Sequence, residues 1–439
     1  MSRNDPNKYQ YLHHQMQKLL NDPEIPVMGY AVCIIEGGKI SFECAGGYRV
    51  FSLDHPAQCL PMNTQTRYRI ASVSKMITAV AIMQLAEQGK LSLDEDVSQY
   101  LGFPLRNPYY PDVIITPRLL MAHYGSICDG SVYSIPCGSA IWECFLPGGR
   151  YYRDGEHFAA PDGMHHKAPG HYYTYSNLNY GLLGTILERL TGQRFDQYVR
   201  THVLTPMGIQ GSFHPGDFNQ EQIQNLAAIY TYVPSLSGGH GTWLPQTDDF
   251  HGQIQPQNMI WIGNPDLGTT DCQEDISDYQ IGTNGTLFSP QGGLRISAHE
   301  LGLFALMLIN EGIADNRTRI LKPSSVKELF TPVWVYSPKL DNRDPSDSAH
   351  AYGAGINIIS TAIGGDHMVN GVDDITMFGH IGSAYGLMSA CYIDPVWKNG
   401  FAYAFNGTGG EQSIYSGRYS GRFIWHERTM SAIYHAIFQ

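Results

Sequence analysis

The chain has 439 residues, of which 43% are hydrophobic and 15% are charged, and its formal net charge is −12. This composition is typical of a globular protein with a large apolar core, and the length allows two or three domains or one large two-lobed unit. The negative charge and the lack of a basic cluster argue against a nucleic-acid partner.

The N-terminal residues and the cysteines bear on the expected compartment. The first 27 residues contain no apolar core of a secretory signal, and no window approaches the roughly 18 uninterrupted apolar residues of a membrane span. Cys128, Cys137 and Cys144 lie close enough in sequence to include a bridge, but free thiols are favoured. We therefore expect a cytoplasmic location without membrane contact, or a periplasmic one if a leader was removed.

The N-terminal part of the chain predicts a helix and then a hairpin. Residues 9–20 have the apolar spacing of an amphipathic helix. The apolar runs 27–35 and 40–44 flank a Gly-Gly pair, which predicts a β-hairpin. Tyr68 and Ile70 then form a β-like entry to a long apolar segment that ends at Gly89, a natural helix stop.

That apolar segment carries too many hydrophobic side chains for one stripe, so its helix should be buried around most of its circumference. Ser72 and Lys75 lie in its first turn, and their i, i+3 spacing places both on one face. Burial disfavours the ammonium form of a lysine and leaves an amine able to accept a proton from a serine. The pattern predicts a nucleophilic Ser72, whereas Ser74 should point elsewhere.

The same Ser-x-x-Lys pattern recurs at Ser324–Lys327. There the serine follows Pro323, and it is predicted to be the N-cap of an ordinary surface helix. A four-residue motif is weak by itself. Chemistry at Ser72 is favoured because Lys75 leads an apolar run, whereas Lys327 leads a mixed one.

The middle of the chain predicts helices and long loops. Thr116 and Pro117 have the pattern of an N-cap and a first helical position, which starts a helix at 115–123. Further helices are expected at 180–190 and 195–203. Residues 126–170 are rich in loops, and residues 208–292 are the least regular part, of a length that is usually functional.

The C-terminal part predicts a helix at 300–311, a final helix at about 423–438, and strands between them at 353–359, 375–380, 386–393 and 400–406. The expected fold is therefore α/β (α+β), with an antiparallel sheet built from N- and C-terminal segments and flanked by helices. The predicted domains are a sheet domain, residues 1–95 and 290–439, and an inserted, mainly helical lobe, residues 96–289.

Two further stretches belong with Ser72 and Lys75. One contains Tyr175 and Asn177 as Tyr-Ser-Asn, and the other contains His380-Ile-Gly382 on a strand whose small residues let a ligand approach the backbone. Together the three pieces resemble the Ser-x-x-Lys, Tyr-x-Asn and Lys/His-x-Gly motifs of the class C β-lactamase and penicillin-binding-protein superfamily. Residues 115–125 and 290–301 are also similar to segments of that family, and the resemblance covers about residues 25–435.

The resemblance implies a β-lactamase/transpeptidase-like fold and a serine hydrolase that forms an acyl-enzyme on Ser72. Lys75 and Tyr175 would share the proton transfers, and Asn177 would orient Lys75 and bind the substrate amide. A tyrosine with the ordinary pKa of about 10 is a base at neutral pH only if a nearby ammonium stabilises its anion. Which of Lys75 and Tyr175 is the base stays open at this point.

The resemblance also implies roles for the third motif. The backbone N–H groups of Ser72 and Ser383 would form the oxyanion hole beside Gly382, each worth about 3–4 kcal/mol at the transition state. The β-lactamases of the family usually have a lysine where this chain has His380, and a histidine is a cation only when neighbours raise its pKa. Members with histidine include D-amino-acid peptidases, D-amidases and esterases, so an ester, amide or D-amino-acid peptide substrate is favoured.

Several alternatives remain open. The same scaffold also serves a β-lactamase, an acyltransferase, or a non-catalytic penicillin-binding or sensor protein. His123 is expected to support structure. Four other histidines lie in loops and could suggest a metal site: His157, His165, His166 and His171. Their spacing is not that of metal ligands, so solvent-exposed loop positions are favoured. No cofactor or metal is therefore expected, and the expected partner is a small-molecule or peptide substrate, with the oligomeric state undetermined.

The aromatic residues of the irregular segment 208–292 are expected to roof the site and to select the acyl group. They are Tyr230, Tyr232, Trp243, Phe250 and Trp261.

Overall fold

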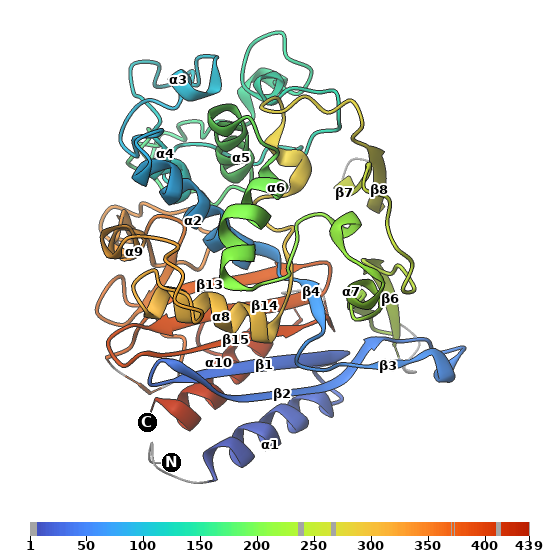
Figure 1. The fold of residues 1–439 in the computed structure, drawn as a ribbon. Coiled ribbons are helices and arrows are strands. Elements are labelled where there is room, and N and C mark those ends of the chain that lie inside the picture. The colour runs from blue at the N-terminus through green and yellow to red at the C-terminus, as the bar shows by residue number, and fades with distance from the viewer. Residues whose placement is uncertain are drawn as a thin grey trace.

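The computed structural model describes residues 7–235, 241–264, 269–369, 371–372, 374–409 and 414–438. Within these residues the largest sheet has nine antiparallel strands in the order β10-β11-β12-β13-β14-β15-β1-β2-β3 (Figure 1). Its strands are β1 (Gly29–Glu36), β2 (Lys39–Val50), β3 (Leu60–Pro61), β10 (Trp334–Val335), β11 (Ala351–Tyr352), β12 (Asn357–Ser360), β13 (Thr376–Ala384), β14 (Leu387–Asp394) and β15 (Asn399–Phe405). The predicted sheet from N- and C-terminal segments is confirmed.

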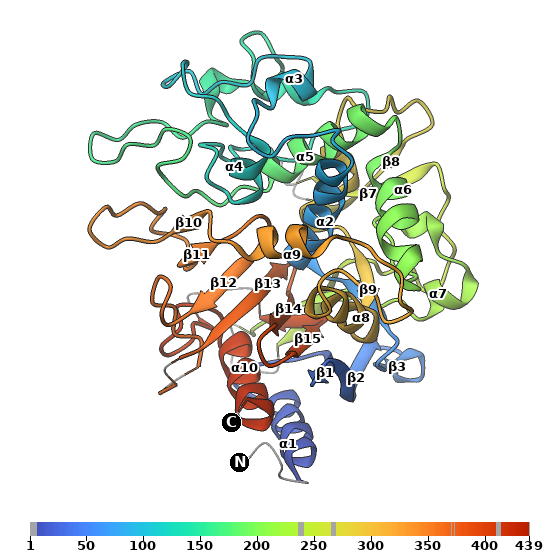
Figure 2. The same ribbon diagram turned by 60° about the vertical axis from the view of Figure 1, so that its left-hand side comes forward.

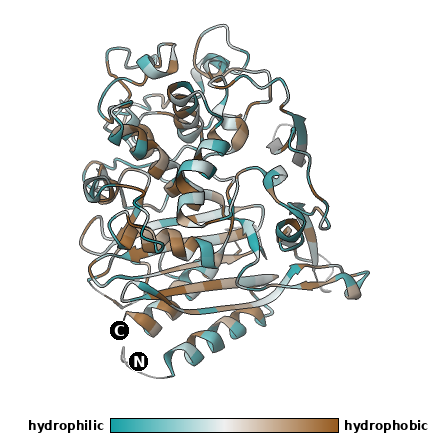
Figure 3. Ribbon diagram, in the orientation of Figure 1, coloured by the Kyte–Doolittle hydropathy of each residue, from teal (hydrophilic) through white to brown (hydrophobic). Residues whose placement is uncertain are grey.

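Helices cover both faces of this sheet. α1 (Lys8–Leu20) and α10 (Ile424–Ile437) pack together on one face, while α8 (Ala298–Ile309) packs on β14, β15 and β1 from the other (Figures 1 and 2). β1 is buried along nearly its whole length because helices lie on both sides of it. Figure 3 shows α8 as largely hydrophobic. The three helices correspond to those predicted at 9–20, 423–438 and 300–311.

The predicted nucleophile segment connects the sheet to a second group of helices. β4 (Arg67–Arg69) pairs with β9 (Arg295–Ser297) and leads through a 3₁₀ turn, Ala71–Val73, into α2 (Ser74–Glu87). Eleven of the 14 residues of α2 are buried, so the prediction of a helix buried around most of its circumference is confirmed. α5 (Leu178–Thr191) packs against α2 and ends at Gly192, which has a φ of 68°.

The region between these parts contains α4 (Pro117–Met121), α5 and α6 (Phe195–Val199), where helices were predicted at 115–123, 180–190 and 195–203. α3 (Ser98–Leu101) and α7 (Gln220–Gln224) were not among the predicted helices. Thr116 caps α4 by accepting a hydrogen bond from the Leu119 N–H, as predicted. No helix in the described part of the chain has both the length and the apolarity that a membrane crossing needs.

Two small sheets in this region were not predicted. β5 (Ile229–Val233) pairs with β6 (Thr242–Thr247) and, in parallel, with β16 (Gly407–Gly409). β7 (Met259–Asn264) and β8 (Thr269–Asp275) form a separate antiparallel pair. These strands were not recognised in the sequence because they are short. Their partner strands are distant in sequence or separated from them by polar turns.

Candidate active site

Ser72 lies in the 3₁₀ turn between β4 and α2, just before the α-helix rather than inside its first turn as predicted. The preceding Ala71 has a φ of 44°, a left-handed conformation that costs a residue with a side chain about 1–3 kcal/mol. Two hydrogen bonds fix the backbone of Ile70. Its N–H donates to Leu294 O over 2.9 Å, and its carbonyl oxygen accepts from Ser389 Oγ over 2.7 Å. These contacts hold the turn that presents Ser72.

The side chains of Ser72, Lys75, Tyr175 and Asn177 converge. Lys75 Nζ lies 3.1 Å from Ser72 Oγ, and Tyr175 Oη donates to the same oxygen over 2.8 Å. Lys75 Nζ also donates to Asn177 Oδ1 over 2.9 Å and to the carbonyl oxygen of Gln291 over 3.0 Å. The structure therefore brings the first two predicted motifs into direct contact.

Burial shifts the pKa values of the two groups that flank Ser72 in opposite directions. It lowers the pKa of Lys75 from 10.5 to about 7, while the charge of Asp129 acts against this change. It raises the pKa of Tyr175 well above 10, an effect that the hydrogen bond to Ser72 partly offsets. At neutral pH Tyr175 is protonated, whereas Lys75 is present in part as the neutral amine.

Asp129 organises the second motif, and the sequence analysis missed it. Its Oδ2 accepts from Asn177 Nδ2 over 2.8 Å, and its Oδ1 accepts from Ser176 Oγ and from the Leu178 N–H, each over 2.9 Å. Asp129 stands in a loop-rich stretch where neither spacing nor neighbours marked it. Its contacts to the second motif exist only in the folded chain.

His123 supports the ring of Tyr175, in line with the structural role expected of it. The two rings stack with centroids 4.2 Å apart, and His123 Nδ1 accepts from the Ser176 N–H over 3.1 Å. Burial lowers the pKa of His123 well below 6.5, with the charge of Lys75 acting in the same direction. The imidazole is therefore neutral, and it fixes the plane of the tyrosine.

The segment before β9 docks on α2 through two polar side chains of the helix. Ser74 Oγ accepts from the Leu294 N–H over 3.2 Å, and Thr78 Oγ1 donates to Pro290 O over 2.7 Å. Ser74 thus has a structural partner away from Ser72, as predicted. The same docking places the Gln291 carbonyl against Lys75.

The third motif lies on β13 beside the turn that carries Ser72. β12 pairs with β13 only as far as Gly379, so in the described chain residues 380–384 have one edge without a partner strand. A Cβ added to Gly382 would lie 2.5 Å from Ile70 O and 3.1 Å from Ser72 N. Only glycine allows the strand to come this close to the turn. Ser383 follows it and lines the same cavity as Ser72.

His380 is not a cation in this structure. Burial lowers its pKa to about 3, and the charge of Lys75 acts in the same direction. Its Nδ1 contacts the carbonyl oxygen of Ile381, which requires a proton on Nδ1, so Nε2 accepts from Tyr352 Oη. His380 therefore does not supply the positive charge that a lysine provides at this position in the β-lactamases of the family.

A cavity of about 340 Å³ opens beside Ser72. Its walls include Tyr175, Tyr352, His380, the loop 346–349 and residues next to the start of α10. None of its described lining residues belongs to segment 208–292, so the expectation of an aromatic roof from that segment is wrong for this cavity.

The aromatic residues of that segment pack into small clusters of their own instead. Tyr230 and Trp243 contact Met28 and Ala228, Tyr232 packs on Trp243, and Phe250 packs on Trp261. Tyr230 and Phe250 are buried in these clusters, and Tyr232, Trp243 and Trp261 are partly buried.

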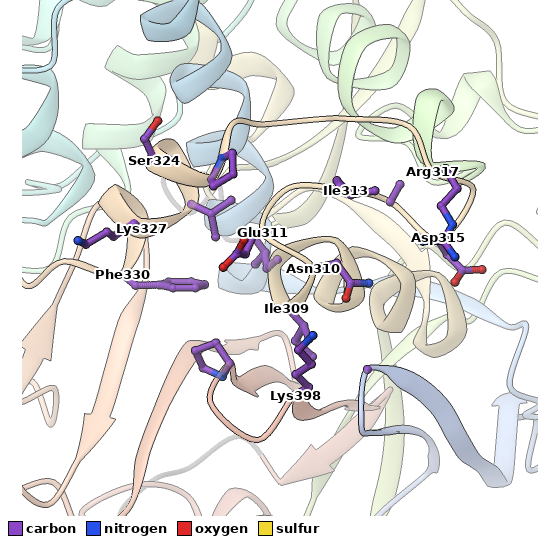
Figure 4. Close-up of a pocket in the computed structure, with 16 residues that line it drawn as sticks. Ile309, Asn310, Glu311, Ile313, Asp315, Arg317, Ser324, Lys327, Phe330 and Lys398 are labelled. Atoms are coloured by element: carbon purple, nitrogen blue, oxygen red, sulfur yellow. The ribbon is translucent and has the colours of Figure 1, made fainter.

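The second Ser-x-x-Lys pattern lies on α9 (Pro323–Phe330), at a separate hollow of about 800 Å³ (Figure 4). Lys322, not Ser324, is the N-cap, because Pro323 takes the first helical position. The N-cap prediction for Ser324 was therefore wrong. Ser324 and Lys327 are both exposed, and Figure 4 shows their polar ends pointing in different directions.

The loop histidines and cysteines also have defined places. His157 is fully buried and contacts Tyr151 O over 3.0 Å, so the solvated loop expected for it was wrong. His165 Nδ1 contacts Asp162 over 2.8 Å. Among the described residues, no group of three or more His, Cys, Asp or Glu side chains is placed to hold a metal ion. Cys128, Cys137 and Cys144 are free thiols, as favoured.

The antiparallel sheet between helical layers, with a serine and a lysine at the start of a buried helix, defines the β-lactamase/transpeptidase-like fold of serine hydrolases. The chain belongs to the Beta-lactamase family, whose family model matches residues 16–421. This membership confirms the resemblance inferred from the three motifs.

Individual relatives are more distant. Protein flp from Staphylococcus aureus (strain MW2) is 30% identical over 196 residues, which is 45% of this chain and 35% of that protein, so the match spans about a third of the relative's length. D-amino acid amidase from Ochrobactrum anthropi SV3, complexed with D-phenylalanine, has a TM-score of 0.62 and 16% identity, covering 97% of this chain and 99% of that chain. The octameric penicillin-binding protein homologue from Pyrococcus abyssi has a TM-score of 0.62 and 21% identity, covering 98% and 76%. The last two likenesses show the fold.

Proposed function

We propose that the chain is a serine hydrolase that cleaves an ester, amide or D-amino-acid peptide bond through an acyl-enzyme on Ser72. The hydrogen bonds of Lys75 carry the proposal. A neutral amine has two N–H groups and one lone pair, and Asn177 Oδ1 and Gln291 O accept the two N–H groups. The lone pair is then directed to Ser72 Oγ, 3.1 Å away, which is the arrangement of a general base and its nucleophile.

The protonation states favour Lys75 over Tyr175 as the base for acylation. Lys75, with a pKa of about 7, is available as an amine near neutral pH, whereas burial keeps Tyr175 protonated. Tyr175 Oη instead donates to Ser72 Oγ and leaves the serine proton free to point at Lys75. Asp129 holds the Asn177 amide so that its oxygen, and not its nitrogen, faces the lysine.

In the proposed reaction Ser72 Oγ attacks the substrate carbonyl carbon while its proton moves to Lys75 Nζ. The carbonyl oxygen becomes an oxyanion, and the backbone N–H groups of Ser72 and Ser383 are its proposed donors. When the tetrahedral intermediate collapses, the leaving amine or alcohol takes up the proton that Lys75 accepted. Water then attacks the acyl-enzyme, the acid is released, and Ser72 regains its proton.

The walls of the cavity favour a small acyl group without a carboxylate at the third motif. His380 is neutral, so it lacks the permanent charge with which lysine-bearing relatives would bind an anionic substrate. The volume of about 340 Å³ lies at the lower end of the roughly 300–1,000 Å³ of ligand pockets. The likeness to a D-amino acid amidase adds support for an amide substrate.

Labelling with a fluorophosphonate probe tests the nucleophile. The wild-type protein should take up one probe per chain, Ser72→Ala should take up none, and Ser324→Ala should label like the wild type because Ser324 belongs to the exposed second pattern. Labelling of Ser72→Ala at the wild-type level would contradict the proposal.

A substrate panel tests turnover. Esters, amides, D-amino-acid peptides and lactams should be read both by product release and by the mass of the acyl-enzyme. Acylation without any hydrolysis across this panel would replace the proposal by a non-catalytic binding or sensor protein. Transfer of the acyl group to an added alcohol or amine in preference to water would identify an acyltransferase.

A further inference from the structure

We propose that Asp347 binds a cationic amino group of the substrate, so that the acyl part of the cleaved ester or amide carries a free amine. This inference rests on the proposed function, since it names the substrate class of the same cavity. Asp347 is half-buried and lines the cavity together with Ser72, Tyr175 and Phe423. It stands outside the three motifs.

In the part of the chain that the structure describes, no cation is bonded to the carboxylate of Asp347. Its Oδ1 accepts from the Ala349 N–H over 2.6 Å, and no described residue forms an ion pair with it. The two arginines whose charges act on it are engaged elsewhere: Arg422 pairs with Asp366 over 2.7 Å, and Arg343 Nη1 donates to Ala349 O over 2.6 Å. A partly buried carboxylate without a cation is unfavourable by itself and favours a cationic ligand.

The charges around the cavity compensate this carboxylate only in part, because burial raises the pKa of Asp347 while the charges of Arg422 and Arg343 act against this rise. His380 and His426 also line the cavity, and burial lowers the pKa of each to about 3, so both are neutral at ordinary pH. The positive charge of Arg422 is offset by Asp366. Arg422 lines the cavity as well, so Arg422, its partner Asp366 and Asp347 together leave one excess negative charge beside the cavity, which favours an ammonium over a carboxylate.

Asp347 lines the same cavity as Ser72, Tyr173 and Tyr175, and its loop is held in place. Its charge also raises the pKa values of both tyrosines, although burial is the larger cause. The loop is joined to the second motif, because the Tyr173 N–H donates to Asn342 O and the Asp344 N–H donates to Tyr173 O, each over 3.0 Å. The Asp347 N–H in turn donates to Asp344 O over 3.0 Å. Because these hydrogen bonds already fix the loop, binding of a ligand to Asp347 does not have to pay for ordering it.

The cavity size limits the ligand further. About 340 Å³ suits one small acyl group, so the proposed substrates are amides or esters of single amino acids, or peptides cleaved after their N-terminal residue. In each of these the amine lies two bonds from the carbonyl carbon that Ser72 attacks.

The experiment compares two substrates that differ only in the amine. Phenylalanine amide, in both enantiomers, and 3-phenylpropionamide are assayed with wild type, Asp347→Asn and the control Asp344→Asn. The control makes the same charge change in the same loop but outside the cavity lining. For Asp347→Asn we expect kcat/KM for the amine substrate to fall about 10- to 100-fold more than for the analogue. For Asp344→Asn we expect the ratio of the two substrates to stay as in wild type.

The outcomes separate this inference from the proposed function. Equal losses on both substrates, or no loss on either, would overturn the role of Asp347 while leaving Ser72 hydrolysis intact. Failure of wild type to label with fluorophosphonate or to cleave any panel substrate would instead refute the function. If Asp347→Asn does not fold, the wild type still decides: N-acetylation of phenylalanine amide should lower kcat/KM at least about 10-fold, and tolerance of the acetyl group would reject the ammonium subsite.

Discussion

Asp129 Oδ2 accepts a hydrogen bond from Asn177 Nδ2 over 2.8 Å. Because an ionised carboxylate only accepts, this contact turns the amide oxygen of Asn177 toward Lys75. The same carboxylate raises the pKa of Lys75 against the lowering effect of burial. One residue outside the three motifs thereby influences both the orientation and the protonation of the proposed base.

Replacing Asp129 by asparagine should change both properties. The new amide N–H₂ group would face the donors of Ser176, Asn177 and Leu178 that now bind the carboxylate, so Asn177 would lose its fixed orientation. We therefore expect kcat/KM to fall about 10- to 100-fold. Loss of the negative charge should lower the pKa of Lys75 further, and the acid limb of the pH–rate profile should move to lower pH. Asp112→Asn, at an exposed carboxylate of the same region, serves as the control. An acid limb that stays in place or moves upward would argue against this role.

The proposed base predicts the pH dependence of the wild-type enzyme. Lys75 must be neutral to accept the Ser72 proton, and its pKa is about 7. We therefore expect kcat/KM to rise with pH through about 7 and to level off above it. Lys75→Met should lower kcat/KM about 10²- to 10⁴-fold, whereas Lys327→Met in the second pattern should leave it unchanged. A profile that falls between pH 6 and 8 would be incompatible with a lysine base.

The same pKa shift predicts how stability depends on pH. Between pH 7 and 10.5 an unfolded Lys75 is protonated and the folded one is not, so the unfolded state binds more protons and stability rises with pH in this window. Relative to Lys75→Met, the free energy of unfolding of wild type should increase by about 1.4 kcal/mol per pH unit there. Urea unfolding of both proteins at pH 7, 8 and 9 measures the difference. Parallel dependences on pH would mean that Lys75 keeps its ordinary pKa.

Gly382 provides a steric test of the proposed oxyanion hole. A Cβ at this position would lie 2.4 Å from Ser389 Oγ and 2.5 Å from Ile70 O, so Gly382→Ala must push β13 away from the Ser72 turn. Overpacking of this kind costs about 1–3 kcal/mol of stability, and loss of one oxyanion donor lowers kcat about 10²- to 10³-fold. Ser383→Ala keeps its backbone N–H and should lose far less. Thermal unfolding and kcat of both variants check these expectations, and a larger loss in Ser383→Ala would implicate its hydroxyl instead.

Local patterns determined much of the architecture in advance. The buried helix α2, the Thr116 cap of α4 and the stop of α5 at Gly192 follow from side-chain periodicity and capping, which act over a few residues. The resemblance added the family fold and placed Tyr175 and Asn177 near Ser72, and the structure brings these side chains together.

The tertiary structure alone decided the partners and charge states that distinguish this site. Asp129, the Gln291 carbonyl and Asp347 approach the motifs only after folding, because their contacts join segments that are distant in sequence. The neutral state of His380 depends on burial, which a residue type cannot reveal. The aromatic segment was misjudged for the same reason: composition shows that rings are present, but only packing shows whether they face a substrate or one another.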